Sequence, residues 1–472
     1  MTTTTVDSSR TEHGSMKYVV GLSIVAALGG LLFGYDTAVI SGGIGFLRAY
    51  FSLDAAETGW AASSALTGCL IGAAIAGWIS DLSGRKRALM IAAILFTVSG
   101  VWSALADSLS SFALARIIGG VGIGMASLVC PLYIAEIAPA ASRGKLVSIN
   151  QFAIVSGILV VYFVNYFIAN ANTEPWNIQY GWRWMFGSET LPAVVFLVLL
   201  FVVPESPRWL VKQGKNESAL GTLTRLGGKE HADRELASIR EVIAQERGTT
   251  TQLFQPGMRI ILVIGVVLAI LQQVTGINVF MYYAPEIFKQ LGSGTNAALL
   301  QTIIIGAVNL TFTIVALYTI DRFGRKPLMI IGSTGMGLSL AALGLAAYLQ
   351  KTELWVLLFI LGYIASFALS MGPVVWVVLS EIFPTHIRGR AMAIATLTLW
   401  AANYLVSQTF PMINESPWLV ENFHHAAPFW LYALFCLVTI VFVVMFVPET
   451  KGKSLEEIEQ MWRSRRAAAQ DE

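Results

Sequence analysis

The segment GWISDLSGRK at residues 77–86 returns as YTIDRFGRK at residues 318–326. Two more segments recur at a similar offset: YIAEIAPAASRGK (133–145) returns as LSEIFPTHIRGR (379–390), and PESPR (204–208) as PETKG (448–452). Self-similarity at one offset is the signature of a repeated structural unit. The sequence therefore predicts a chain made of two related halves.

The composition predicts that these halves lie in a membrane. Of the 472 residues 55% are hydrophobic and only 13% charged, and the mean hydropathy is +0.65. A hydrocarbon core about 30 Å thick requires about 20 apolar residues in a helix. By this criterion we expect an all-α membrane protein with twelve transmembrane helices in two six-helix repeats. The expected spans are 18–42, 58–80, 87–106, 108–137, 146–170, 184–203, 259–290, 296–320, 327–350, 353–383, 391–413 and 426–447.

Basic residues fix the expected topology. Lysine and arginine gather in alternate connections, which the positive-inside rule places in the cytoplasm, and an even number of spans puts both termini on that side. We therefore expect a cytosolic N-terminal tail (1–17), a six-helix bundle (18–203), a cytoplasmic linker with short helices (204–258), a second six-helix bundle (259–447) and a cytosolic C-terminal tail (448–472). Parallel six-helix repeats are typical of carriers that enclose one central site.

Several other functions are not expected. Cys69, Cys130 and Cys436 each lie in an apolar stretch without metal-ligand spacing, so we expect neither disulfides nor a metal site. A net charge of +2 argues against nucleic acid as a partner. The sequence has no nucleotide-binding loop, zinc signature or nucleophile elbow, so we expect no cofactor and no catalytic residues.

Asp36, Arg116 and Glu189 lie deep inside the expected spans, where ionisable residues are costly and usually line a cavity or pair with each other. At about 1.5 Å per residue, Asp36 and Arg116 both fall on the order of 10 Å below the outer surface, so they can meet. One interpretation is a static ion pair that joins two helices. The other is a proton switch, in which changes in pairing move Asp36 between its charged and neutral forms. Glu189 lies at a similar depth and is a candidate second member of a proton relay, or a group that hydrogen-bonds a helix end.

Amide side chains mark a candidate site for a polar, uncharged ligand. A sugar presents several hydroxyl groups, and amides supply donors and acceptors without bringing charge into the membrane. In a regular helix Gln273 and Asn278 point about 140° apart, so a common ligand requires a break, which Gly276 makes possible. Trp376 offers an aromatic face for the sugar ring, beside Gly372 at a site of expected bending. The candidate amides are Gln151, Gln272, Gln273, Asn278 and Asn309. Each of them is alternatively a hydrogen bond between two helices, and Trp376 a packed core residue.

The repeated polar segments predict charge networks at the cytoplasmic helix ends. Networks of this kind tie neighbouring helices in one state of a carrier and break when its halves rock. The alternative is simple positive-inside anchoring. The expected members are Asp81, Arg85, Glu136 and Arg143 in the first half and Asp321, Arg325, Glu381 and Arg388 in the second.

Over essentially its whole length the chain resembles the sugar porters of the major facilitator superfamily, and within them most closely the bacterial D-xylose/proton symporters. The segments that carry this resemblance are GGLLFGYDTAVISG (29–42), RIIGGVGIG (116–124), NQFAIVSG (150–157), VPESPRWL (203–210), QQVTGINVFMYYAPE (272–286), GPVVWVVLSEIFP (372–384) and FVPETKGKSLEE (446–457). The resemblance implies an aspartate at the position of Asp36 in proton-coupled members. It also implies sugar contacts at Phe33, Gln151, Gln272, Gln273, Asn278, Tyr282, Asn309, Gly372 and Trp376.

Two positions depart from the D-xylose carriers. Ile158 and Leu399 stand where those carriers typically have glutamine, so two polar contacts are lost. Glucose-transporting relatives also have an apolar residue at the first position, and the change relaxes a pocket that rejects a hexose.

We therefore expect proton-coupled symport of a monosaccharide, D-xylose or a hexose such as D-glucose, by alternating access. The expected partners are the sugar, the proton and the lipid bilayer of a bacterial plasma membrane, and we expect a functional monomer. The alternatives are a facilitative uniporter of the same fold, in which Asp36 is structural, and a sugar sensor that does not transport.

Overall fold

The computed structural model describes residues 16–139, 142–245, 258–351, 353, 355–383 and 388–451, and these ranges contain helices and no strands. The expected N-terminal tail lies outside the described residues up to residue 15, and the C-terminal tail lies outside them from residue 452.

The first bundle contains the helices up to residue 202: α1 (Met16–Phe51), α2 (Ala55–Ser83), α3 (Arg85–Leu105), α4 (Leu109–Ile137), α5 (Arg143–Asn170), α6 (Glu174–Trp176), α7 (Trp182–Gly187) and α8 (Thr190–Val202). A π-helical turn, Asn177–Gly181, joins α6 to α7, so the sixth span is a nearly continuous helical run from Glu174. Three short helices follow: α9 (Pro207–Lys212), α10 (Asn216–Gly227) and α11 (Lys229–Gln245).

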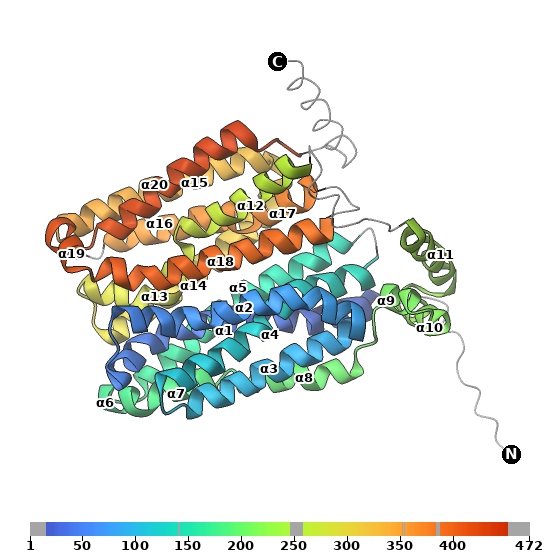
Figure 1. The fold of residues 1–472 in the computed structure, drawn as a ribbon, viewed down its shortest axis with the longest axis horizontal. Coiled ribbons are helices and arrows are strands. Elements are labelled where there is room, and N and C mark those ends of the chain that lie inside the picture. Colours follow the sequence, from blue (N-terminus) through green and yellow to red (C-terminus); the bar gives the residue numbers. More distant parts are fainter. Residues whose placement is uncertain are drawn as a thin grey trace.

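The second bundle contains α12 (Met258–Val274), α13 (Ile277–Gln290), α14 (Thr295–Phe323), α15 (Arg325–Tyr348), α16 (Val356–Leu369), α17 (Met371–Ile382), α18 (Arg388–Asn414), α19 (Pro417–Phe423) and α20 (Ala427–Phe446). Figure 1 shows the two bundles side by side, with α9, α10 and α11 at one end of the molecule. We call this the linker end, and the other the far end.

Eleven helical stretches of the described chain are long and apolar enough to cross a membrane. The expected span 391–413 corresponds to α18, which is not among them because it carries several polar residues, including Asn403, Ser407 and Gln408. This helix packs against α2 of the first bundle and α12 of the second. Its polar residues therefore lie on a helix that packs between the two bundles. We call the region where the bundles meet the seam.

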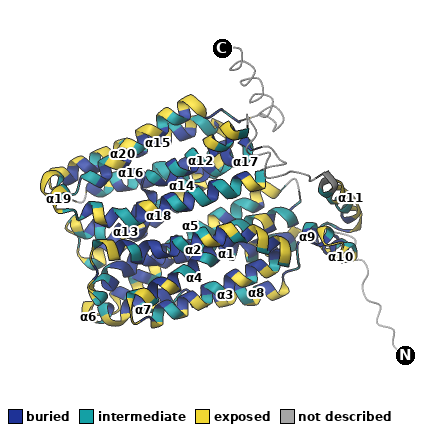
Figure 2. Ribbon diagram, in the orientation of Figure 1, coloured by how far each residue is buried: buried dark blue, intermediate teal, exposed yellow. Residues whose placement is uncertain are grey.

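The outer faces of the bundles are apolar. Phe201 of α8, Leu338 of α15 and Met445 of α20 are each at least 63% exposed. Figure 2 shows exposed residues along the outer helices, whereas α1, α2 and α4 are largely buried. An apolar surface of this extent suits lipid rather than water.

The first span is longer than its apolar stretch predicts. We expected it to end near residue 42, but α1 continues to Phe51 and ends only at Ser52, whose φ is 55°. The apolar criterion stops at the first polar residues, whereas a helix continues until its backbone turns. Asp36 is therefore much further from the end of its helix than the sequence indicated.

Two spans of the second bundle are interrupted. The seventh breaks between α12 and α13, where Gly276 has a φ of 92°, as expected for a glycine that relieves backbone strain. The tenth breaks at Ser370, between α16 and α17, slightly before the bend expected at Gly372. Tyr363 of α16 donates a hydrogen bond from its hydroxyl to the backbone oxygen of Thr275, 2.9 Å away, so the break of the seventh span is held against α16.

Candidate functional site

A buried ion pair joins α1 to α4. Asp36 has no exposed surface and Arg116 is 2% exposed. The guanidinium Nη1 donates to Asp36 Oδ1, and Nη2 donates to the Asp36 backbone oxygen at 2.8 Å. The Arg116 guanidinium also lies 5.3 Å from the centre of the Phe186 ring. A guanidinium fixed from three directions places one positive charge deep inside the first bundle.

Glu189, at the start of α8, completes a cluster of three ionisable groups. Its carboxyl group is fully buried against the Asp36 carboxyl group and within electrostatic range of Arg116, and, apart from this contact between the two acids, neither of its oxygens has a hydrogen-bond partner within the described chain. Asp36 Oδ2 is also unpartnered there. Two carboxyl groups and one guanidinium are electrically neutral only when one carboxyl group carries a proton. Because an uncompensated buried charge is costly, this cluster can hold and release a proton.

Three of the predicted amides form a hydrogen-bonded chain in the second bundle. Asn278 Nδ2 donates to Gln273 Oε1 at 2.6 Å, and Gln273 Nε2 donates to Gln272 Oε1 at 3.3 Å. Gln272 Nε2 then donates to the backbone oxygens of Met371 and Gly372, 2.8 and 3.1 Å away. The break at Gly276 brings together side chains that a regular helix would separate. We call these three residues the amide chain. It also links the two interrupted spans.

The remaining predicted sugar contacts lie on both sides of the seam. Phe33 of α1 packs against Trp400 of α18, with ring centres 5.6 Å apart. Tyr282 of α13 accepts a hydrogen bond at 3.4 Å from Asn403 of α18, a residue that the sequence analysis did not identify. A lone asparagine in an apolar helix gives little sequence signal, because such residues commonly join helices.

Gln151 of α5 and Trp376 of α17 are half-buried, and Asn309 of α14 is 7% exposed. None of these three side chains has a hydrogen bond within the described part of the chain. Ile158 of α5 is half-buried and Leu399 of α18 is 4% exposed, so the two departures from the D-xylose carriers lie in opposite bundles.

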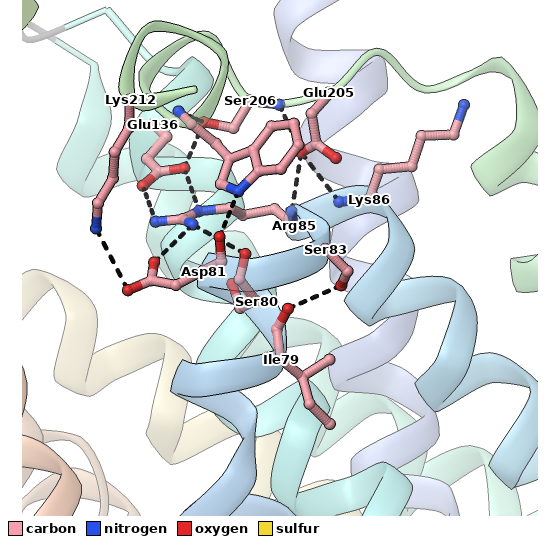
Figure 3. A network of polar contacts seen from close by, with 11 residues as sticks. Ile79, Ser80, Asp81, Ser83, Arg85, Lys86, Glu136, Glu205, Ser206 and Lys212 are labelled. Carbon is pink, nitrogen blue, oxygen red and sulfur yellow. Dashed lines mark hydrogen bonds and ion pairs between the residues drawn. The ribbon is translucent and has the colours of Figure 1, made fainter. Parts of the chain in front are cut away.

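At the linker end, the first repeated segment forms a dense charge network (Figure 3). Arg85 donates from Nε and Nη2 to Glu136, at 2.9 and 3.0 Å, and from Nη1 to Asp81 at 3.0 Å. Ser206, just before α9, donates to Glu136 Oε2 at 2.5 Å. Glu205 accepts from the backbone nitrogens of Arg85 and Lys86, at 2.9 and 3.1 Å. The network therefore fixes α2, α3, α4 and α9 to one another.

The second bundle repeats this arrangement. Arg325 pairs with Asp321 at 3.0 Å and with Glu381 at 2.8 Å, and Thr450 donates to Glu381 at 2.5 Å. Glu449 accepts from the backbone nitrogens of Arg325 and Lys326, at 3.1 and 3.0 Å.

Two expected members do not join these networks. Arg143 is exposed and makes no ion pair with the described residues. Arg388 donates from Nε to the Phe383 backbone oxygen at 3.2 Å, while its Nη2 is buried without a partner in the described chain. Each network lies within one bundle and its adjoining segment. None of the ion pairs in these two networks joins one bundle to the other.

Glu205 and Glu449 were not predicted as network members. Both lie directly after the repeated prolines of PESPR and PETKG. The repetition of a glutamate at this position is the sequence feature that could have identified them. Partial burial opposes ionisation of Glu449, but backbone donors from Lys451, Arg325, Lys326 and Thr450 outweigh this and lower its pKa.

Polar contacts between the bundles lie instead at the far end. Arg48 of α1 forms a two-pronged ion pair with Glu415, just after α18, at 2.5 and 2.7 Å. Gln408 of α18 accepts from Ser63 of α2 at 2.8 Å and donates to the Ala56 backbone oxygen at 3.0 Å. These contacts hold the two bundles together at the far end.

The described residues contain no group of three or more His, Cys, Asp and Glu side chains arranged to hold a metal ion.

Comparison with known proteins identifies the family. Residues 22–462 match the family described as "Sugar (and other) transporter". The chain is 50% identical to the D-xylose-proton symporter of Escherichia coli strain K12, over 96% of this chain and 97% of the relative. It is 45% identical to the arabinose-proton symporter of Bacillus subtilis strain 168, again over 96% and 97% of the two chains.

The fold has a solved counterpart. The structure of the major facilitator superfamily proton:xylose symporter XylE, bound to 6-bromo-6-deoxy-D-glucose, superimposes with a TM-score of 0.81 at 49% identity, covering 94% of this chain and 99% of the other. The chain is therefore a multi-pass membrane protein with the major facilitator fold, and it belongs to the Sugar (and other) transporter family.

Proposed function

We propose that this protein carries a monosaccharide into the cell together with a proton, by alternating access. The observation that carries the proposal is the buried cluster of Asp36, Arg116 and Glu189, which has one more carboxyl group than it has cations. A uniporter does not require this extra carboxyl group. Burying an ionisable residue in a membrane costs free energy, and such residues usually serve transport.

Protonation of Asp36 supplies the conformational step. When Asp36 is charged, it holds Arg116 through its side chain and its backbone oxygen. A proton on Asp36 removes the attraction between the side chains, so Arg116 turns towards Glu189, the other acid in range. This exchange changes the packing of α1 against α4, and α1 also contacts α13 and α5 at the centre of the molecule.

The amide chain of Asn278, Gln273 and Gln272 is the proposed sugar site. Its donors and acceptors are bonded to each other in this structure, and a sugar hydroxyl replaces one of those bonds at little net cost. Because the amide chain connects the two helix breaks, sugar binding also changes the contacts of α13 and α17. We include Gln151, Asn309 and Trp376 in the site because the resemblance to the sugar porters implies sugar contacts at these positions and their side chains have no hydrogen bonds within the described chain.

We propose D-xylose or a hexose such as D-glucose as the substrate. The relatives named above are a D-xylose-proton and an arabinose-proton symporter, which favours a pentose. Ile158 and Leu399 favour a wider range, because an apolar wall does not reject a hexose as a hydrogen-bonding wall does.

We further propose that the linker end faces the cytoplasm, since basic connections gather there. The described conformation is then inward-facing, closed on the outer side by Arg48 and Glu415. We also propose that the carrier works as a monomer in a bacterial inner membrane, without a cofactor or a catalytic reaction.

Reconstitution in proteoliposomes tests this function. Labelled xylose and glucose are supplied separately, with and without a protonophore, while the external pH is recorded. Sugar-dependent external alkalinisation and a loss of uphill uptake with the protonophore are expected. Uptake that moves no proton and ignores the protonophore would establish the facilitative uniporter instead.

Asp36→Asn provides the matched variant. It is expected to abolish uphill accumulation while sparing counterflow, in which sugar exchanges without net proton movement. Uphill uptake by this variant at the wild-type level would rule out the proton switch.

A further inference from the structure

Helix α18 carries buried polar side chains along the seam. Asn403 is 1% exposed, Ser407 has no exposed surface, and Asn414, the last residue of the helix, is 4% exposed. Buried polar groups cost free energy unless they are hydrogen-bonded, so their partners indicate what they serve. These partners lie on α13 of the second bundle and, through the neighbouring Gln408, on α2 of the first.

One turn of α18 binds two consecutive tyrosines of α13. Asn403 Nδ2 donates to the Tyr282 hydroxyl at 3.4 Å, and the Tyr283 hydroxyl donates to the Ser407 backbone oxygen at 2.8 Å. Ser407 Oγ donates to Asn403 Oδ1 at 3.0 Å, and this bond orients the amide group with its nitrogen towards Tyr282. The two helices are therefore joined at this turn.

Tyr282 lies one helical turn from the amide chain. Residues four apart lie on the same face of a helix, so Asn278, at the end of the amide chain, and Tyr282 share one face of α13. Asn278 is bonded to Gln273 across the break at Gly276. A ligand that replaces this bond therefore acts on the turn of α13 that Asn403 contacts.

The same stretch of α18 also holds the first bundle. Gln408 follows Ser407 directly, and it accepts from Ser63 Oγ at 2.8 Å and donates to the Ala56 backbone oxygen at 3.0 Å, both in α2. A Cβ atom built on Gly59 of α2 would lie 2.4 Å from the Gln408 backbone oxygen, so the two helices approach closely here. Within one turn, α18 is therefore bonded both to α13 and to α2.

We propose that Asn403 and Ser407 transmit sugar binding at the amide chain to the closure of the far end, which rests on the sugar site proposed above. Sugar bound to Asn278 fixes the adjoining turn of α13, and this turn holds Asn403 through Tyr282. Asn403 and Ser407 in turn hold Gln408 on α2. Bound sugar therefore favours the closed far end, because one contact network biases both places. Asn403 is a positioning residue, since it acts through Tyr282.

A cysteine at Thr58 reports the closure. Thr58 of α2 is 4% exposed and lines a small pocket at the far end, together with Tyr283 of α13 and Glu415 after α18. Labelling of Thr58→Cys by a maleimide therefore requires the far end to open, and the native cysteines are buried. The purified carrier is labelled with and without saturating D-xylose, and separately D-glucose, while sugar binding is measured by calorimetry. We expect bound sugar to slow labelling about fivefold or more, the lower range for coupling between two sites.

Asn403→Leu keeps the approximate size of the side chain but removes the bond to Tyr282. It is expected to reduce this slowing to less than about twofold while sugar still binds, because little coupling free energy remains. Tyr282→Phe removes the other partner of the same bond, so the double variant should lose no more coupling than Asn403→Leu alone. Thr409→Val is the matched control, since Thr409 of α18 donates to backbone oxygens of its own helix, and it should keep the full slowing.

Full slowing in Asn403→Leu would overturn the proposal, and so would an equal loss in Thr409→Val, which would indicate a general loosening of α18. Loss of sugar binding by Asn403→Leu would place Asn403 in the sugar site and would overturn the transmission as well. If Asn403→Leu does not fold, Ser407→Ala removes the hydroxyl that orients Asn403 and is measured in its place, with the same expected loss. The wild-type arm separates this inference from the proposed function. A carrier that binds neither sugar refutes the proposed substrates, whereas a carrier that binds sugar without slower labelling refutes only the transmission.

Discussion

At the scale of single residues, the buried cluster of the first bundle imposes a charge balance. Arg116 is the one cation among three ionisable groups that have almost no contact with solvent. Breaking a buried ion pair is costly because one charge is left uncompensated, at about 3–5 kcal/mol. In the proposed mechanism, stability and transport therefore depend on the same side chains.

The first prediction concerns this balance. Arg116→Met leaves Asp36 and Glu189 without their cation, and we expect it to lower the free energy of unfolding by about 3–5 kcal/mol. The double variant Asp36→Asn/Arg116→Met removes the stranded charge, so it should be more stable than Arg116→Met alone. Thermal unfolding of the purified proteins measures both. Equal stability of the single and double variants would contradict a buried charge pair.

The second prediction concerns Gly119, where Ser99 and Asp36 converge. Gly119→Ala places a methyl group within 3 Å of both side-chain oxygens and should displace them. We expect uphill uptake to fall much more than counterflow. Gly21→Ala is the control, because a Cβ atom at this exposed position of α1 meets nothing within 4 Å. Similar uptake by the two variants would show that the space beside Gly119 is not needed.

Sequence reasoning found some of these residues and not others, for a physical reason. Asp36, Arg116 and the amides are conspicuous because charged and amide groups are expensive in an apolar span. Ser99 is not, since a serine in a membrane helix usually bonds its own backbone. Its significance depends on which groups face it, and only packing determines that.

At the scale of elements, the linker-end networks act as helix caps. Glu205 and Glu449 each accept two backbone N–H bonds at the first turn of a helix, α3 in one bundle and α15 in the other. A negative charge is favourable at a helix N-terminus. A Cβ atom on Gly84 or Gly324, before each helix, would lie within 3 Å of the capping carboxylate.

The third prediction follows from the lowered pKa of Glu449. A lowered pKa in the folded protein means that this carboxylate stabilises the fold above its unfolded pKa, and that the stabilisation is lost as the pH falls through the folded value. Glu449→Gln should therefore reduce the melting temperature at pH 7, and the difference from wild type should shrink below about pH 4. Glu421→Gln, at an exposed position of α19, is the control. A difference from wild type that does not change with pH would contradict the capping role.

The fourth prediction concerns the closed far end. Glu415→Gln removes the charge that holds Arg48 across the two bundles, so the outward-open population should rise. An exposed ion pair contributes up to about 1 kcal/mol, which corresponds to a shift of roughly fivefold. The opening is measured by labelling a cysteine introduced at Gly45, which lines the same pocket as Arg48 and Glu415. The native cysteines are buried. Glu421→Gln again serves as the control, and labelling at the wild-type rate would show that the pair does not hold the gate.

Elements were predictable where a local rule applies. The break at Gly276 followed from the geometry of two amides, and the helices followed from apolar length. The outer end of α1, the break at Ser370 and the π-helical turn at Asn177–Gly181 did not follow, because tertiary contacts decide them. The Arg48–Glu415 pair joins residues outside the apolar stretches that defined the expected spans, so no sequence pattern connects them.

At the scale of the whole molecule, the duplicated halves have different tasks. The linker-end networks are almost symmetric, but the ionisable cluster lies only in the first bundle and the amide chain only in the second. In the proposed mechanism, the proton site and the sugar site therefore lie on opposite sides of the seam. Phe33 against Trp400 and the hydrogen bond from Tyr162 to the Met281 backbone oxygen, at 2.8 Å, are direct contacts between the bundles.

The last prediction addresses sugar selection, which also depends on both bundles. Ile158→Gln in the first bundle and Leu399→Gln in the second restore an amide on each side of the seam. Each added hydrogen-bonding partner for a sugar hydroxyl contributes about 0.5–1.5 kcal/mol, so the double variant should raise the preference for xylose over glucose roughly tenfold. Competition between the two labelled sugars measures this ratio. Ile158→Leu, which keeps an apolar wall, is the control and should leave the ratio unchanged. A double variant with the wild-type ratio would mean that these positions do not face the sugar, and selectivity would then have to arise within the amide chain of the second bundle.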